Sequence, residues 1–250
     1  MTESVKYTAD LSSITFDKST EELRMATATI KGDHIEVSSI KYFRAGADRV
    51  QLAAYGEKKT HPSPWADNYL AVQDRLPAPK IEQAGIRLAS IIEIDTKNTS
   101  QADVEAHLEG SVAVVKGGKT AKITFEKLKD NDLKLVHLVI QPEDLKDAFN
   151  DSPKALGRLR DYGGDARAVN EIFVVMEADL AESFTASASF GVKAAALGLE
   201  IEAKAGGKVK TSTEVTFSEK TTFAYLLQNP KWERGKDRIK KFSDDQWGMR

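Results

Sequence analysis

The side chains that could support metal binding or acid–base chemistry are four isolated histidines. None stands in an HxH or HExxH pattern, and none lies beside paired carboxylates at ligand spacing. Scattered histidines of this kind are typical of structural or solvated positions. The chain has no cysteine, which excludes disulfides, thiolate catalysis and cysteine-ligated zinc. The prediction is a protein that is not an enzyme and holds no metal or cofactor. The four histidines are His34, His61, His107 and His137.

Two glycine pairs raise the question of a phosphate-binding loop. Neither Gly117-Gly118 nor Gly206-Gly207 lies between a strand and a helix in GxGxxG or GxxxxGK[ST] order, so each is interpreted as a turn or kink. The chain also lacks a GxSxG nucleophile elbow. A formal net charge of -2 gives no general attraction to nucleic acid, and no nucleic-acid partner is expected.

Basic residues gather in the C-terminal segment "KWERGKDRIKK" and, beside aromatic residues, in the region up to "GEKKTHPSPW". One interpretation of the C-terminal segment is a solvated helix. The other is contact with an acidic partner or an anionic lipid surface, to which each Lys or Arg contributes about 1 kcal/mol. The predicted lipid-binding residues are Arg44, Arg49, Lys58, Lys59, Trp65, Lys236, Lys240 and Lys241.

The elements that position these residues belong to a chain of 250 residues, 41% hydrophobic and 30% charged, which predicts a soluble globular protein with one substantial core. The start, "MTESVKYTAD", lacks a signal-peptide pattern, and no apolar run is long enough for a transmembrane helix. A cytoplasmic location is therefore expected for the inactive protein.

Helices and strands are both expected along the chain. Helices are predicted from the capping-box pattern at Ser19 through about Ile30, as one or two turns in "WADNYLAVQDRL", and in "PEDLKDAF" and "SPKALGRLRDY". Strands are predicted at Ile35–Tyr42, Arg49–Tyr55, "LKLVHLVI", "IFVVMEA" and "TTFAYLLQ". The residues from Asn229 onward are predicted to form a tail.

Four further segments, 86–94, 104–114, 184–194 and 197–217, alternate with period two, and their charges fall opposite the apolar parity. An ordinary half-buried sheet shows the same pattern. However, Leu197 to Phe217 as one strand would span about 70 Å, whereas a compact domain of this size is about 45 Å across. The strand must therefore break, and Gly206-Gly207 is the expected place.

These segments also meet the requirements of a membrane-crossing β-strand, which needs about 9–11 residues with one apolar face free of Lys and Arg. They can therefore be folded in one state and extended in another. The predicted membrane-inserting residues are Ile86, Leu88, Ile92, Val104, Leu108, Val112, Phe190, Val192, Leu197, Leu199 and Ile201.

The order of elements resembles the pore-forming N-terminal domain of gasdermins, from about Ile35 to Gln228. The runs that carry the resemblance are "LVIQPEDLKDAF", "ALGRLRDYGGDARAVNEIFVVMEADLAES", the alternating pair and "TEVTFSEKTTFAYLL". The resemblance implies an α+β fold, a twisted and mainly antiparallel sheet with helices packed around it and two extendable hairpin regions. It implies a pore-forming domain at 1–228 and a short basic tail at 229–250, without a separate inhibitory domain.

The resemblance further implies a protein that binds anionic phospholipid at the inner leaflet of the plasma membrane, oligomerises and inserts two β-hairpins per subunit into a large barrel, causing lytic cell death. The hairpins would come from about Gly85 to Phe125 and from Phe184 to Phe217. Short fungal gasdermin-like regulators, which respond to a variant homologue, are the most similar group, so a homo-oligomer or hetero-oligomer is expected. The alternatives are a bacterial antiphage gasdermin held inactive by its tail, a soluble lipid- or partner-binding α+β module that does not insert, and an enzyme without a recognisable motif.

Overall fold

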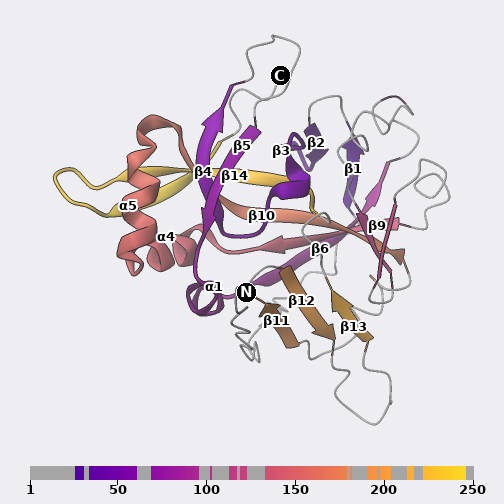
Figure 1. Ribbon diagram of the computed structural model, residues 1–250. Helices are drawn as coiled ribbons and strands as arrows, with labels where there is room; N and C mark the ends of the chain where they lie inside the picture. Colours follow the sequence, from indigo (N-terminus) through magenta and orange to yellow (C-terminus); the bar gives the residue numbers. More distant parts are fainter. Residues whose placement is uncertain are drawn as a thin grey trace, which may run out of the picture.

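The computed structural model (Figure 1) describes residues 26–30, 34–60, 69–95, 102, 113–116, 119–122, 133–178, 181, 191–195, 198–203, 213–216 and 222–245. Strands dominate, and helices α1 (Ala78–Ala84), α4 (Pro142–Asn150) and α5 (Pro153–Asp161) accompany them. The predicted α+β class is therefore confirmed. Short 3-10 turns are η1 (Ala47–Arg49) and η2 (Gly163–Asp165).

Seven strands close into a barrel in the order β14-β3-β2-β1-β6-β9-β10, with β10 pairing back onto β14. Every contact around this ring is antiparallel except β1–β6, which is parallel. Closure leaves these strands without long unpaired edges. The strands are β1 (Ala26–Ile30), β2 (His34–Val37), β3 (Ile40–Phe43), β6 (Arg87–Ile94), β9 (Leu133–Val139), β10 (Ala166–Glu177) and β14 (Thr222–Trp232).

Five more strands extend this sheet beyond the ring. Strands β4 (Ala54–Lys59) and β5 (Tyr69–Arg75) continue from the start of β10, and β15 (Ile239–Asp244) pairs with the end of β14. The hairpin of β7 (Ala113–Lys116) and β8 (Lys119–Lys122) pairs with the end of β10. The predicted turn at Gly117-Gly118 lies between these two strands in the sequence, outside the described residues.

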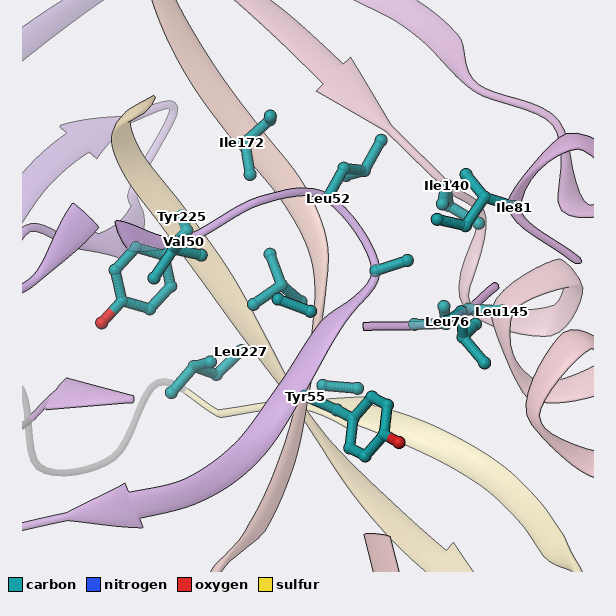
Figure 2. Packing of buried hydrophobic residues seen from close by; sticks show 14 of the residues in the cluster. Val50, Leu52, Tyr55, Leu76, Ile81, Ile140, Leu145, Ile172, Tyr225 and Leu227 are labelled. Carbon is teal, nitrogen blue, oxygen red and sulfur yellow. The ribbon is translucent and has the colours of Figure 1, made fainter. Parts of the chain in front are cut away.

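The barrel separates two hydrophobic cores. The inner core takes buried side chains from all seven ring strands, among them Ile35, Ile92 and Phe173. The outer core lies between the barrel wall and α1, α4, α5, β4 and β5; it includes Tyr55 and Leu145 (Figure 2). Because β10 contributes to both cores, its uninterrupted apolar run is buried on both faces, as predicted from "IFVVMEA".

The two predicted helices after β9 are confirmed. Pro142 and Pro153 stand in the first turns of α4 and α5, where a missing backbone N–H costs nothing. Glu143 and Asp144 add favourable charge to the first turn of α4. Each helix buries one face in the outer core, through Leu145, Ala148 and Phe149 in α4 and through Ala155, Leu156 and Leu159 in α5.

Several local predictions were wrong. Ala26–Ile30, predicted as the end of a helix, is strand β1, and "WADNYLAVQDRL" holds strand β5 in place of a helical turn. Pairing of β5 with β4 and burial of Leu70 and Leu76 override the helix-like spacing of its apolar residues. Residues 61–68 of the preceding loop, including His61 and Trp65, lie outside the described part of the chain.

The stretch predicted as one strand from Ile35 to Tyr42 is a hairpin, because Ser38 and Ser39 have φ values of 50° and 70° and reverse the chain. Arg49 ends η1, and strand β4 begins only at Ala54. The C-terminal segment also differs from the predicted tail. Strand β14 continues to Trp232, and β15 returns beside it, so most of residues 229–245 belong to the sheet.

A separate three-stranded sheet contains β11 (Gly191–Ala195), β12 (Gly198–Ala203) and β13 (Thr213–Thr216). The β11–β12 hairpin turns between Ala195 and Gly198, which is where the apolar parity shifts from even to odd numbers. The predicted break within 197–217 is also present, since β12 and β13 pair antiparallel with Gly206-Gly207 between them. In the described part of the chain, no helix is long and apolar enough to cross a membrane.

Candidate functional site

Four neighbouring strands of the barrel, β6, β9, β10 and β14, each run antiparallel to the next. The register places Glu93 opposite Lys134, Leu133 opposite Glu177, and Val174 opposite Thr222. The ends of the four strands therefore lie side by side at one end of the barrel (Figure 1). We call this end the rim, defined by Ile94, Leu133, Glu177 and Thr222.

The chain leaves the rim and returns to it twice, whereas the first predicted hairpin region begins at Gly85, before β6. The chain leaves β6 after Ile94 and comes back into β9 at Leu133; it leaves β10 after Glu177 and comes back into β14 at Thr222. We call residues 95–132 the first connection and residues 178–221 the second connection. Each joins two strands that are already paired, and the two pairs are adjacent in the sheet.

The predicted membrane-inserting residues of the first region divide between the barrel and its connection. Ile86 is buried in the outer core and Ile92 in the inner core, and Leu88 lies within β6. Leu88 and Ile92 therefore belong to the barrel wall, and Ile86 immediately precedes it. Val104, Leu108 and Val112 lie outside the described residues.

In the second connection, the register places apolar residues of β11 opposite apolar residues of β12. Val192 stands opposite Ile201, and Ala194 stands opposite Leu199. Ile201 also pairs with Val215 across β12 and β13, whereas Lys193 pairs with Glu200. Residues of like polarity thus meet across the ladder, as in a sheet with one apolar face. Phe190 and Leu197 lie outside the described residues.

Four of the predicted lipid-binding residues lie near one or the other end of β14. Arg49 is exposed, and the residue after it lies against the rim, because Thr222 Oγ1 donates a hydrogen bond to the Val50 carbonyl oxygen at 2.7 Å. Lys240 and Lys241 are exposed on β15, which pairs with the far end of β14. Lys236 lies in the turn between these strands, 3.0 Å from Glu233.

The remaining predicted lipid-binding residues lie closer to the protein interior or in the adjoining hairpin. Arg44 is buried, and Lys58 Nζ lies 2.9 Å from Asp245 Oδ2. Lys59 pairs with Glu57 at 2.6 Å on β4. The charges of Arg44 and Lys58 are thus directed into this structure, whereas those of Arg49 and the C-terminal lysines lie at its surface.

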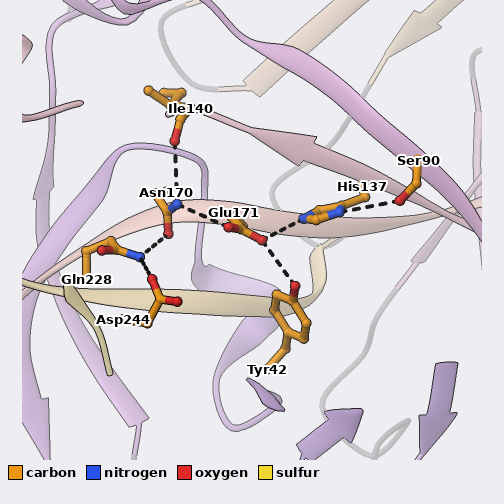
Figure 3. Close-up of polar contacts among 8 residues, drawn as sticks. All are labelled: Tyr42, Ser90, His137, Ile140, Asn170, Glu171, Gln228 and Asp244. Carbon is orange, nitrogen blue, oxygen red and sulfur yellow. Dashed lines mark hydrogen bonds and ion pairs between the residues drawn. The ribbon is translucent and has the colours of Figure 1, made fainter. Parts of the chain in front are cut away.

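A polar cluster inside the barrel wall was not predicted from the sequence. His137 Nε2 lies 2.8 Å from Glu171 Oε2, and the Tyr42 hydroxyl donates to the same oxygen at 3.2 Å (Figure 3). The other ring nitrogen of His137, Nδ1, lies 3.5 Å from Ser90 Oγ. The His137 ring also stacks on Phe173, with centroids 4.3 Å apart. A polar residue interrupting each of two apolar strands, "LKLVHLVI" and "NEIFVV", is the signal that sequence alone contains.

The electrostatics of this cluster favour an ionised Glu171 and a neutral Tyr42. Burial alone would raise the pKa of Glu171, but the hydrogen bond and charge of His137, with hydrogen bonds from Tyr42 and Asn170, hold it below its usual value. Burial, together with the nearby Glu171 charge, raises the pKa of Tyr42 far above its usual range.

The cluster continues through amides to the last strand. Asn170 Nδ2 donates to Glu171 Oε1 at 3.3 Å, and Gln228 Nε2 donates to Asn170 Oδ1 at 2.9 Å and to Asp244 Oδ1 at 2.7 Å. The network therefore joins β3, β6, β9, β10, β14 and β15. Because both Glu171 oxygens accept hydrogen bonds from neighbouring side chains, we assign the cluster a structural role, joining the strands whose ends form the rim.

Within the described ranges, no three His, Asp or Glu side chains converge in a way that could hold a metal ion. Comparison of the chain with protein-family models, with curated proteins and with solved structures found no match. The rim and the two connections that start there are therefore the candidate functional site.

Proposed function

We propose that this chain is a pore-forming protein that binds anionic membranes, oligomerises and inserts its two connections as β-hairpins into a large transmembrane barrel. The observation that carries this proposal is the arrangement of the rim. If both connections straighten, the four strands continue as one uninterrupted antiparallel sheet, because the two hairpins grow from adjacent strand pairs.

The length of the second connection and the place of its turn support this conversion. A transmembrane strand needs about 9–11 residues, and residues 178–221 exceed two such strands. Continuing the pairing of Val174 with Thr222 would put the tip of an extended hairpin at Gly198. The existing β11–β12 hairpin turns nearby, between Ala195 and Gly198. We propose that this pairing is kept on insertion, with β-bulges taking up the offset of three residues from the pairing that continues from Val174 and Thr222.

An inserted four-stranded sheet requires further subunits. Its two outer edges would leave backbone N–H and C=O groups unpaired in lipid, at a cost of several kcal/mol per group. Pairing with the same sheet of neighbouring subunits satisfies both edges when the ring closes. Oligomerisation, with identical copies or with a variant homologue, is therefore part of the proposal.

The rim also sets the orientation on the membrane. Hairpins that leave at the rim bring that end of the barrel toward the lipid, and Arg49 lies there. Lys236, Lys240 and Lys241 lie at the other end of β14 and would face away from the same bilayer. We therefore propose Arg49 as a headgroup contact and expect a smaller contribution from the three lysines.

Dye leakage tests the proposal directly. Liposomes with and without phosphatidylserine or cardiolipin are mixed with the purified protein, and leakage is expected with the anionic vesicles. Binding without leakage would instead support a lipid-binding module that does not insert. Absence of both binding and leakage, alone and after mixing with a sequence-divergent homologue or cutting after Gln228, would contradict the proposal.

Mixing with a homologue and cutting after Gln228 distinguish two modes of regulation. Leakage that appears on mixing with a homologue favours control by a variant partner, as in the fungal group. Leakage that appears on cutting after Gln228 favours inhibition by the C-terminal segment, as in the bacterial alternative. A ligand or cut shifts such an equilibrium only if it changes the relative free energies of the two states.

A further inference from the structure

The end of β10 has a different partner on each edge. Met176 pairs with Lys134 of β9 on one edge and with Val115 of β7 on the other. Two residues earlier, Val174 pairs with Thr222 of β14. Because β9 pairs with one edge of β10 from Val175 to Glu177, β7 occupies the other edge, along which β14 would continue if it were extended backward from Thr222.

We propose that the β7–β8 hairpin is a latch that holds the second connection in its folded-back form. This inference rests on the proposed function, since it concerns the order in which the two connections extend. An extended second hairpin must place the residues before Thr222 antiparallel along β10, opposite Met176. In this structure Val115 fills that position in a parallel pairing, and a strand edge accepts one partner.

The latch couples the two connections. Strand β7 belongs to the first connection, so the first connection has to leave β10 before the second can pair along it. Release of the first connection alone breaks one short pairing. The second connection alone cannot complete its hairpin, because its own returning arm has no edge to join. The first connection therefore extends before the second.

A disulfide tests the latch, and the chain offers a cysteine-free background for it. In the double variant Val115→Cys/Met176→Cys, the two thiols stand at paired positions, within the reach of a disulfide. The oxidised protein should bind anionic liposomes normally but leak at least about tenfold more slowly than the same protein after reduction. The matched controls are the single variants Val115→Cys and Met176→Cys, which cannot form the tether between β7 and β10 and should leak equally with and without reductant.

Equal leakage from the oxidised and reduced latch variant would overturn the latch while leaving the pore intact. If neither the parent nor any reduced variant leaks, the proposed function fails and the latch fails with it. Thermal melting of each form shows whether the barrel has stayed folded.

A second variant tests the latch in the opposite direction should the disulfide variant fold poorly. Val115→Pro removes a backbone donor and disrupts β7. Continuing the pairing of Glu93 with Lys134 puts the tip of the first extended hairpin at Ala113-Val114, so residue 115 would adjoin a turn, where proline is tolerated. The variant should leak sooner than the parent at equal binding; leakage as slow as the parent's would count against the latch.

Discussion

Arg167 on β10 and Asp245 just beyond β15 form a buried ion pair, with 2.6 Å between Arg167 Nε and Asp245 Oδ2. Lys58 of β4 approaches the same oxygen at 2.9 Å. The C-terminal hairpin is thereby joined to strands from two other parts of the sheet. Burial alone would raise the pKa of Asp245, but the hydrogen bonds from Arg167 and Lys58 keep it below its usual value.

The first prediction concerns the two ion pairs of Asp245. Asp245→Ala leaves two cations without their shared carboxylate, and removing one partner of a buried pair costs about 3–5 kcal/mol in free energy of unfolding. Asp237→Ala is the matched control, because its pair with Arg160 is exposed and contributes about 1 kcal/mol or less. Urea denaturation measures the loss of unfolding free energy in both variants. Equal losses would show that the buried Asp245 pair contributes no more to stability than the exposed pair.

A second prediction follows from the lowered pKa of Glu171. A carboxyl whose pKa is lower in the folded state stabilises the protein fully above its unfolded pKa of about 4.3 and loses that contribution as pH falls through the folded value. Glu171→Gln should therefore be less stable than the parent at pH 7, and this difference should shrink below about pH 4. Unfolding midpoints across pH 2–7 measure it, and a pH-independent difference would argue against an ionised Glu171.

The third prediction separates the two ends of β14. Arg49→Glu should weaken sedimentation with anionic liposomes, most clearly at low salt, where charges are least screened. Lys240→Glu/Lys241→Glu should have a smaller effect, although it changes more charge. A larger effect of the lysine pair would place the far end of the barrel, and not the rim, against the membrane.

Sequence patterns predicted the elements whose signals are local. The strands at β9, β10 and β14 have strong apolar runs, and α4 and α5 begin at prolines, so each was found. Strand β5 was missed because its apolar spacing also fits a helix, and only pairing with β4 decides between them. The parity of the apolar residues changes between 184–194 and 197–217, and the β11–β12 turn falls there, although the sequence analysis predicted a break only at Gly206-Gly207.

The closed ring and the polar cluster were beyond the reach of the sequence. Strand order around the barrel depends on contacts between distant segments, such as the parallel β1–β6 pairing. Tyr42 and Glu171 meet although they lie 129 positions apart. The burial of Arg44 and Lys58 could not be read from their residue types either, since a basic side chain is equally consistent with a surface and with a buried pair.

The fourth prediction tests the apolar parity of the second connection. Leu199→Lys or Val192→Asp would put a charge against lipid and should abolish leakage, whereas Glu200→Lys should be tolerated in the lumen. Thermal melting and liposome binding are measured on the same samples. A variant with normal melting and binding but no leakage supports insertion; leakage that falls only in step with melting temperature would identify the alternation as core patterning.

The central claim is that β12 and β13, which pair with each other here, become one continuous arm of a membrane hairpin. Glu202 and Glu214 are opposite one another in that pairing, so the variant Glu202→Cys/Glu214→Cys can hold the arm folded back by a disulfide. Lys193→Cys/Glu200→Cys is the matched control, because it joins β11 to β12, the two arms of the hairpin. The decisive measurement is dye leakage from phosphatidylserine liposomes before and after reduction. The account predicts that the oxidised Glu202→Cys/Glu214→Cys protein binds without leaking and leaks once reduced, while the control leaks in both states. Equal leakage from the oxidised and reduced Glu202→Cys/Glu214→Cys protein would show that the arm does not straighten and would contradict the proposed insertion.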